Sequence, residues 1–348
     1  MGGIVAIAVA LAASSGCGGP PPSPTSKAAW GNVVRAGTKP FEVVPVPRSD
    51  EVAAEAVRSG AMVQAGLDTV KIQVAEPRPG EQAEAVRAAT RRQPPALIVE
   101  APADPDADLE EAVAEARAKG LLVLALGRSL AGDSEGPGRE VVIAPSPFKA
   151  SAGRIVALAI RNATNGKLDP KSGALVVVRP DADPFVADRV AALKEALGAA
   201  GVAKVDELRV DADATAAGDA VAEAVAEAVK SRPGVTLVLA TDGASLVAAA
   251  DAATESVGTD RPFVPAGYTW DEPTAKSQAS VGTYAAAGIY AQDRLFRKAV
   301  YIAARALRGE DPAGRVEIDT PVLESPPDAA LPRPRIVPPT DADGPAPQ

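Results

Sequence analysis

From Phe41 onward, short aliphatic runs alternate with longer stretches in which apolar residues recur at helical spacing among Ala, Glu and Arg. Strands are predicted over 41–46, 69–74, 96–100, 121–126, 141–144, 173–178, 204–210, 236–240 and 263–266. Helices are predicted over 50–65, 80–92, 108–119, 146–162, 184–200, 214–230, 245–256 and 291–307. Repeated strand–helix units predict parallel sheets with right-handed crossovers and helices on both faces. Since nine strands are too many for one half of the chain, we expect two similar Rossmann-like α/β lobes.

Composition narrows the chemistry that this chain can perform. Its 348 residues suffice for two domains of about 150 residues each. The net charge of −9 argues against a nucleic-acid partner, which requires a basic face. The sequence has no histidine and one cysteine, Cys17, so it has no histidine-based catalytic or metal site and no intramolecular disulfide. We expect no cofactor, no metal and no enzymatic activity.

The amino terminus is typical of an exported protein. Residues 4–13 form an apolar stretch of the length of a signal-peptide core, too short to span a bilayer. The small residues before Cys17 resemble a bacterial lipoprotein signal, which implies a signal peptide over 1–16, lipidation of Cys17 and a membrane-anchored, periplasmic location. Ser14 stands where Leu is usual, and no basic residue follows Met1, so an ordinary cleaved signal with an incidental cysteine is the alternative. The Pro/Gly-rich segment 17–40 is expected to be a tether.

Polar and aromatic residues follow several predicted strands, where the ligands of open α/β sheets bind. Gly127-Arg128 follows one strand, Thr241-Asp242-Gly243-Ala244 another, and Gly267-Tyr268-Thr269-Trp270-Asp271 a third. With the closing Ala306-Leu307-Arg308-Gly309-Glu310, their order resembles the type I periplasmic binding proteins of the ribose- and galactose-binding branch, over about 41–323.

This resemblance implies two lobes joined by three crossovers. The N-terminal lobe is expected to hold 41–145 and about 267–290, and the C-terminal lobe 146–266 and about 291–325. The segment 326–348 is rich in Pro, Asp and Ala and is predicted to be disordered. The implied function is a monomeric solute-binding lipoprotein that takes a small polar solute to the permease subunits of an ABC importer. The ligand-binding residues that it implies are Arg128, Arg189, Asp242, Tyr268, Trp270, Asp271 and Tyr290.

Each of these residues also has a structural interpretation. Arg189 could form a surface ion pair, and Arg128 could pair with Asp133 or Glu135. Asp242 could cap the following helix. The remaining four could serve local packing or capping: Tyr268 and Trp270 in loop packing, Asp271 as the cap of a short turn over 272–277, and Tyr290 as a packed hinge aromatic.

Departures from the family pattern bear on the ligand. The first βα loop, 45–49, lacks the aromatic residues that stack on sugars, and Gly127 replaces the acid of the usual Asp-Arg pair. The ligand is therefore either sugar-like or anionic, since Arg128 and Arg189 together suit a carboxylate. Alternative functions are a ligand-sensing component of a membrane signalling system and a homologue that no longer binds. A hydrolase using Asp242 and Asp271 is disfavoured, because Gly127 and Thr269 lack the acids of the pattern.

An acidic segment follows the third predicted strand. Asp104, Asp106, Asp108 and Glu115 match positions 1, 3, 5 and 12 of a calcium-binding loop, but Leu109 occupies the position that requires Gly. These acids are better explained as partners of the positive amino end of a helix.

Overall fold

The computed structural model describes residues 41–47, 57–68, 70–75, 77–78, 80–102, 104–130, 138–164, 172–180, 184–211, 217–232, 234–255, 263–270, 272–290 and 292–326. The predicted signal peptide, Cys17 and the tether lie outside these ranges, as does all of the predicted tail except Pro326. None of the helices in the described ranges is long and apolar enough to cross a membrane.

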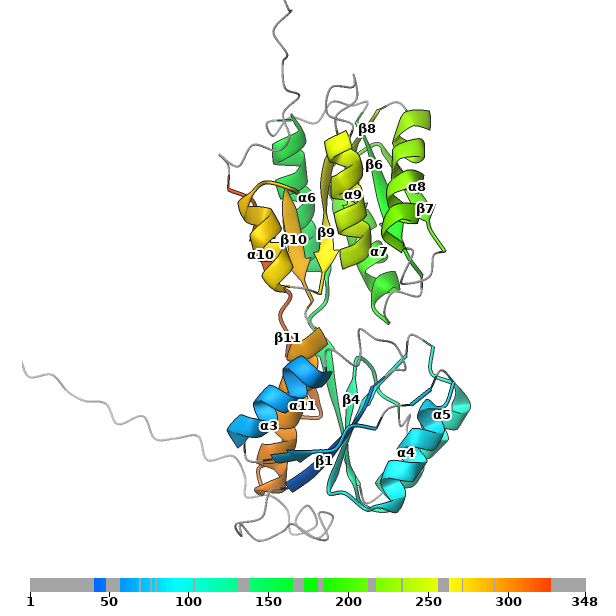
Figure 1. Cartoon of the computed structure of the whole chain (residues 1–348), viewed down its shortest axis with the longest axis vertical. Helices are drawn as coiled ribbons and strands as arrows, with labels where there is room; N and C mark the ends of the chain where they lie inside the picture. The colour runs from blue at the N-terminus through cyan, green and yellow to red at the C-terminus, as the bar shows by residue number, and fades with distance from the viewer. Residues whose placement is uncertain are drawn as a thin grey trace, which may run out of the picture.

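The first lobe is built on a six-stranded sheet in which every neighbouring pair is parallel. Its spatial order is β11 (Arg315–Ile318), β5 (Glu140–Pro145), β4 (Leu122–Leu126), β3 (Ala96–Glu100), β1 (Phe41–Val46) and β2 (Val70–Ile72). One face is covered by α4 (Gln82–Arg91) and α5 (Ala107–Ala118). The π-helical turn η1 (Val57–Ala61), α3 (Met62–Asp68) and α11 (Gln292–Leu307) lie on the other side, as Figure 1 shows.

The second lobe repeats this plan with one antiparallel edge strand. Its sheet has the order β12 (Val322–Glu324), β10 (Ala286–Ile289), β9 (Val264–Thr269), β8 (Val235–Ala240), β6 (Gly173–Val178) and β7 (Lys204–Arg209), and only β12 is antiparallel to its neighbour. Aliphatic residues of α8 (Ala217–Ser231) and α9 (Gly243–Glu255) pack on one face. The opposite face packs against α6 (Lys149–Thr164) and α7 (Val186–Ala199), and α10 (Glu272–Ser280) packs beside β10.

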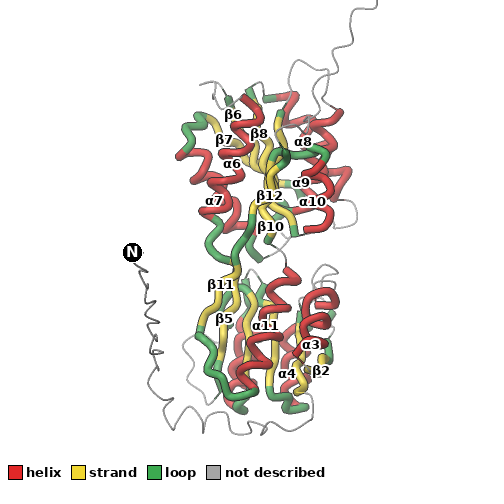
Figure 2. Tube along the Cα trace, turned by 90° about the vertical axis from the view of Figure 1, so that its left-hand side faces the viewer, coloured by secondary structure: helices red, strands yellow, loops and turns green. Residues whose placement is uncertain are grey.

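Three chain segments connect the two lobes, which are stacked along the long axis in Figure 2. They join β5 to α6, β10 to α11 and β11 to β12. The first and third segments are tied together, because the Ser146 amide donates to the Ile318 carbonyl at 2.8 Å and the Ser146 hydroxyl lies 3.2 Å from Asp319 Oδ1. The expected class, two α/β lobes with parallel sheets and a three-crossover hinge, is confirmed.

The expected division of the later chain between the lobes is wrong. Residues 267–290 were assigned to the N-terminal lobe and 291–325 to the C-terminal lobe, but β9 and β10 belong to the second sheet, whereas α11 and β11 belong to the first lobe. The reason is strand pairing: β9 pairs in parallel with β8 and then with β10, so the chain completes β10 before it crosses.

The nine predicted strands are all present, and the structure adds β10, β11 and β12. The sequence of β10, AAGI, has Ile289 as its one β-branched residue among Ala and Gly, which are depleted in strands, and β12 has only three residues. The turn predicted over 272–277 is instead the helix α10, which continues to Ser280. The first part of the helix predicted over 50–65 lies outside the described ranges.

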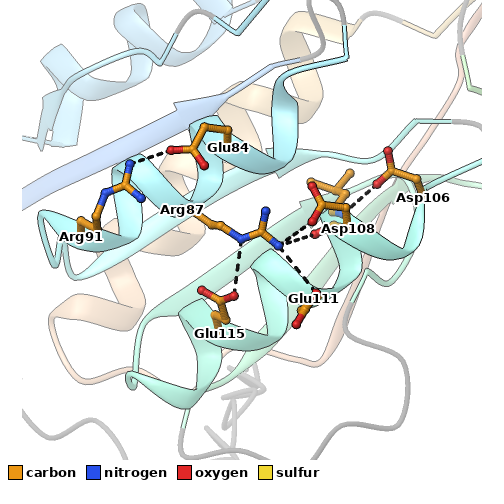
Figure 3. Close-up of polar contacts among 8 residues, drawn as sticks. Glu84, Arg87, Arg91, Asp106, Asp108, Glu111 and Glu115 are labelled. Carbon is orange, nitrogen blue, oxygen red and sulfur yellow. Dashed lines mark hydrogen bonds and ion pairs between the residues drawn. The ribbon is translucent and has the colours of Figure 1, made fainter.

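The acidic segment before and within α5 joins two helices of the first lobe (Figure 3). The Asp106 carboxylate accepts the Leu109 amide at 2.7 Å and so caps α5. Arg87 of α4 donates to Asp108 at 2.6 Å and pairs with Glu115 at 3.4 Å, and the hydrogen bond from Arg87 lowers the pKa of Asp108. The interpretation of these acids as partners of the helix amino end is confirmed for Asp106. No group of three or more acids that could hold a metal ion is found in the described part of the chain.

Candidate functional site

The topology directs the loops of both sheets toward the space between the lobes. β5 ends at one crossover and β10 at another, and the strands beside them in each sheet run parallel to them, apart from β12. The carboxyl ends of β3, β4, β6, β8 and β9 therefore face the opposite lobe. This is the edge at which open α/β sheets bind their ligands.

Arg189, in the first turns of α7, is the largest fully buried side chain, with 0% of its surface exposed. Its Nε donates to the Thr241 carbonyl at 2.6 Å. Its guanidinium carbon lies 4.0 Å from the centre of the Tyr290 ring, 5.6 Å from that of Phe148 and 5.8 Å from that of Tyr268. The interpretation of Arg189 as a surface residue is therefore wrong. We call Arg189, Phe148, Tyr268 and Tyr290 the arginine cage.

Tyr268 supports this cage from inside the second lobe. Its side chain is fully buried, and its hydroxyl lies 3.0 Å from Ser151 Oγ and donates to the Phe148 carbonyl at 3.3 Å. Burial raises the pKa of Tyr268 to about 12. The Phe148 ring meets it edge-on, with ring centres 5.4 Å apart. Tyr268 therefore holds Phe148 and Arg189 in place and leaves no surface of its own for a cleft wall.

Asp242 lies between β8 and α9 and is only 3% exposed. Its carboxylate accepts the Ser245 amide at 3.1 Å and the Ser245 hydroxyl at 2.6 Å, so the helix-cap interpretation is confirmed. Arg179 Nη1, from the end of β6, donates to Asp242 Oδ1 at 3.2 Å. Because Thr241 accepts from Arg189, the Arg179–Asp242 pair is adjacent in the chain to the arginine cage.

The remaining predicted residues are less closely gathered. Arg128 follows β4 in the first lobe and is exposed, and Asp133 and Glu135, its suggested partners, lie outside the described ranges. Trp270 follows β9, is half-buried and packs against the core cluster that contains Tyr268 and Tyr290. Asp271 also lies outside the described ranges.

A cavity of about 370 Å³ lies beside the arginine cage, between the lobes. Gly127 contributes from the first lobe, Phe148 from the first crossover and Phe185 from the second lobe. The lobes are close here, since a Cβ on Gly127 would lie 3.0 Å from the Phe185 ring. Lys149 and Glu195 pair at 2.6 Å on its wall. This volume is typical of a site for a small molecule.

Sequence reasoning missed several residues of this region. Phe148 belongs to the arginine cage, and Arg179 pairs with Asp242. Glu100 ends β3, is 2% exposed and accepts a hydrogen bond from Gln292 at the start of α11. For Glu100 and Arg179 a signal exists in the sequence: each is a charged residue at the end of an aliphatic strand, where a polar side chain reaches the ligand edge of the sheet.

Among the described residues, an ion pair joins the two lobes away from the hinge segments. Glu272, at the start of α10 in the second lobe, pairs with Arg294 of α11 in the first. Glu272 also pairs with Lys276 at 2.8 Å. Its hydrogen bonds with Lys276 and Arg294 lower the pKa of Glu272. The pair favours the lobe arrangement seen in this structure.

Comparison with known proteins relates this geometry to solved structures. No protein-family model and no curated protein matches the sequence. GanP, a glucose-galactose binding protein from Geobacillus stearothermophilus, is 18% identical, with a TM-score of 0.60 over 82% of this chain and 98% of that one. A periplasmic ribose ABC transporter protein from Conexibacter woesei is 21% identical, with a TM-score of 0.62 over 83% of this chain and 92% of that one. The chain has the type I periplasmic binding protein fold.

A further structure with this type I fold was solved with a ligand. It is a carbohydrate transporter solute-binding protein from Agrobacterium radiobacter in complex with D-arabinose. It is 14% identical to this chain, with a TM-score of 0.61 over 82% of this chain and 95% of that one. In the type I fold of the present chain, Arg189, Tyr268 and the Arg179–Asp242 pair belong to the second lobe, Phe148 and Tyr290 lie on the connecting segments, and Glu100 and Arg128 belong to the first lobe.

Proposed function

We propose that this protein is an extracytoplasmic solute-binding protein of an ABC-type importer and holds a small polar ligand between its lobes. The observation that carries the proposal is the gathering of Arg179, Asp242 and the arginine cage at the ligand edge of the second sheet. They lie in a fold shared with a glucose-galactose binding protein, a ribose transporter protein and a protein solved with D-arabinose.

Binding in this proposal needs no covalent step. Asp242, Tyr290, Trp270 and Asp271 contact the ligand from the second lobe and the hinge, and Arg128 contacts it from the first lobe. Arg189 and Tyr268 have no exposed surface at all, so they act on the ligand through the residues that they hold in place, Tyr290 and Thr241. The three connecting segments allow the lobes to close by hinge bending. The Glu272–Arg294 pair stabilises the arrangement of the lobes seen in this structure.

In the same proposal the protein acts as a monomer at the outer face of a membrane. Cys17 carries the lipid anchor, and the segment 17–40 is the tether between the membrane and the lobes. The closed form delivers the solute to permease subunits of the importer. No nucleic acid and no cofactor takes part.

A thermal-shift screen of the full chain tests this proposal. The panel consists of pentoses, hexoses, polyols, nucleosides, amino acids and organic anions. A ligand at one hundred times its Kd stabilises the folded state by about 2.7 kcal/mol, which raises Tm by several degrees. Asp242→Asn should abolish the shift, while Asp251→Asn, on the exposed face of the same helix, should retain it. A folded protein with no shift across the panel would contradict the proposed function.

A further inference from the structure

Arg179 is a charged residue at the ligand edge whose hydrogen-bonding capacity is only partly used. It follows β6 directly, and 14% of its side chain is exposed. Within the described part of the chain, its guanidinium makes one hydrogen bond, from Nη1 to Asp242 Oδ1 at 3.2 Å. The Nε atom is buried and has no hydrogen-bond partner. A buried donor without an acceptor destabilises the folded state, so an acceptor supplied by a ligand would be favourable here.

Asp242 is not placed to satisfy that atom. Its two oxygens are held by the amide and the hydroxyl of Ser245 at the start of α9, at 3.1 and 2.6 Å. The carboxylate therefore meets Arg179 through a single oxygen at Nη1 instead of forming a bidentate pair. The Nε–Nη2 edge of a guanidinium presents two parallel N–H groups, which match the two oxygens of a carboxylate.

The other two arginines considered for the site differ from Arg179. Arg189 is enclosed by three aromatic rings and donates to a backbone carbonyl. Arg128 is exposed on the first lobe. Of these three arginines, Arg179 alone directly follows a buried strand, has its guanidinium held by a carboxylate and still keeps 14% of its side chain exposed.

We propose that the ligand of this protein carries a carboxylate, and that Arg179 selects it through the Nε–Nη2 edge of its guanidinium. The inference rests on the proposed solute-binding function and names the chemical class of the solute. Asp242 orients Arg179 by holding Nη1, and the ligand carboxylate supplies the acceptor that Nε lacks. A neutral sugar of the same shape offers hydroxyl groups in place of this acceptor pair and binds more weakly.

Calorimetric titration of the full chain with matched acids and neutral sugars tests the inference. The probes are D-glucuronate against D-glucose, D-galacturonate against D-galactose and, as an open-chain pair, D-ribonate against ribitol. We expect at least one acid to bind about 10- to 100-fold more tightly than its neutral counterpart, the range of a charge-assisted hydrogen bond. Arg179→Gln should remove this preference, because glutamine is shorter and has neither the charge nor the paired N–H groups of the guanidinium.

Two further variants distinguish the effect of the paired N–H groups of Arg179 from the effect of its charge alone and from a loss of folding. Arg179→Lys keeps the charge without the paired N–H groups and should also lose most of the preference. Arg154→Gln removes the same charge from the exposed face of α6 and should keep the preference. The thermal midpoint of each variant is measured alongside. If Arg179→Gln fails to fold, the result with Arg179→Lys decides.

The outcomes also separate this inference from the proposed function. A neutral sugar that binds as tightly as its acid, or an acid preference that survives in the folded Arg179 variants, overturns the inference and leaves solute binding intact. Binding of none of the six probes by the folded wild-type chain overturns the inference, and with no shift in the thermal screen it overturns the proposed function as well.

Discussion

Replacing Arg189 by methionine tests whether the arginine cage stabilises the second lobe. Methionine is an unbranched side chain that fills most of the space of the arginine stem but has no guanidinium. The change removes the hydrogen bond to the Thr241 carbonyl and the contact with the Tyr290 ring. It leaves the Thr241 carbonyl and the rings of the cage in place.

The size of the effect follows from the contacts that are lost. A hydrogen bond from a charged donor contributes about 1.5–3 kcal/mol, and a desolvated cation–π contact about 2 kcal/mol. Removing the guanidinium also relieves the cost of burying its charge, which offsets part of the loss. We therefore expect Arg189→Met to lower the free energy of unfolding of the second lobe by about 2–4 kcal/mol.

Trp270 provides a local probe for the measurement, because it packs against the core cluster that contains Tyr268 and Tyr290. Trp30 is the only other tryptophan in the sequence, so Trp30→Phe leaves a single reporter. Urea titrations followed by Trp270 fluorescence give the free energy of unfolding of the region around it. Arg154→Met, on an exposed position, is the matched control. A change of less than about 1 kcal/mol for Arg189→Met, or a stabilisation, would refute the reasoning. The free-energy cost of burying the charge would then be as large as the stabilisation from its contacts.

Three further predictions concern packing, pH and capping. Gly288→Ala places a Cβ 2.7 Å from the Tyr268 ring and should destabilise the second lobe by about 1–3 kcal/mol in the same titration, whereas an unchanged midpoint would show that the ring can move freely. Because the folded state lowers the pKa of Glu272, this carboxylate contributes stability above the ordinary carboxyl pKa and loses it as pH falls through the lowered value. Glu272→Gln should therefore reduce the loss of stability between pH 6 and pH 3, and an identical loss in the variant would contradict this sign. Asp106→Ala removes the cap of α5 and should cost about 0.5–2 kcal/mol, measured as faster amide exchange at Leu109 and a lower thermal midpoint, both of which Asp104→Ala should leave unchanged.

The alternation of aliphatic runs and amphipathic stretches was sufficient to predict the fold class. A buried parallel strand is a short aliphatic run, and a helix that covers a sheet repeats its apolar residues every three or four positions. Both signals are local in the chain, so they predicted the first nine strands in chain order. β10 and β12 gave no such signal, because β10 is built of Ala and Gly with a single Ile, and β12 is very short. They are strands because their neighbours in the sheet supply hydrogen-bond partners.

Part of the candidate site was also accessible from the sequence. The resemblance to the type I periplasmic binding proteins implied Arg189, Tyr268 and Tyr290 as candidates, and the structure shows the Arg189 guanidinium over both tyrosine rings. Their roles were not accessible. Arg189 is buried by the rings of Phe148, Tyr268 and Tyr290, which lie on the first connecting segment, on β9 and on the second connecting segment. No pattern of neighbouring residues in the sequence predicts this burial.

The sequence by itself determined the alternation of elements, the number of lobes and the polar residues that end the strands, because each depends on residues close together in the chain. Only the tertiary structure decided which lobe receives each late element. β9 and β10 continue the second sheet beside β8, whereas β11 pairs with β5, which lies far earlier in the chain, and these pairings overturned the expected assignment. The tertiary structure also decided that Arg179 pairs with Asp242, 63 residues away, and that its Nε atom lacks an acceptor. These contacts depend on how distant segments pack together in space, and the order of residues along the chain does not predict that packing.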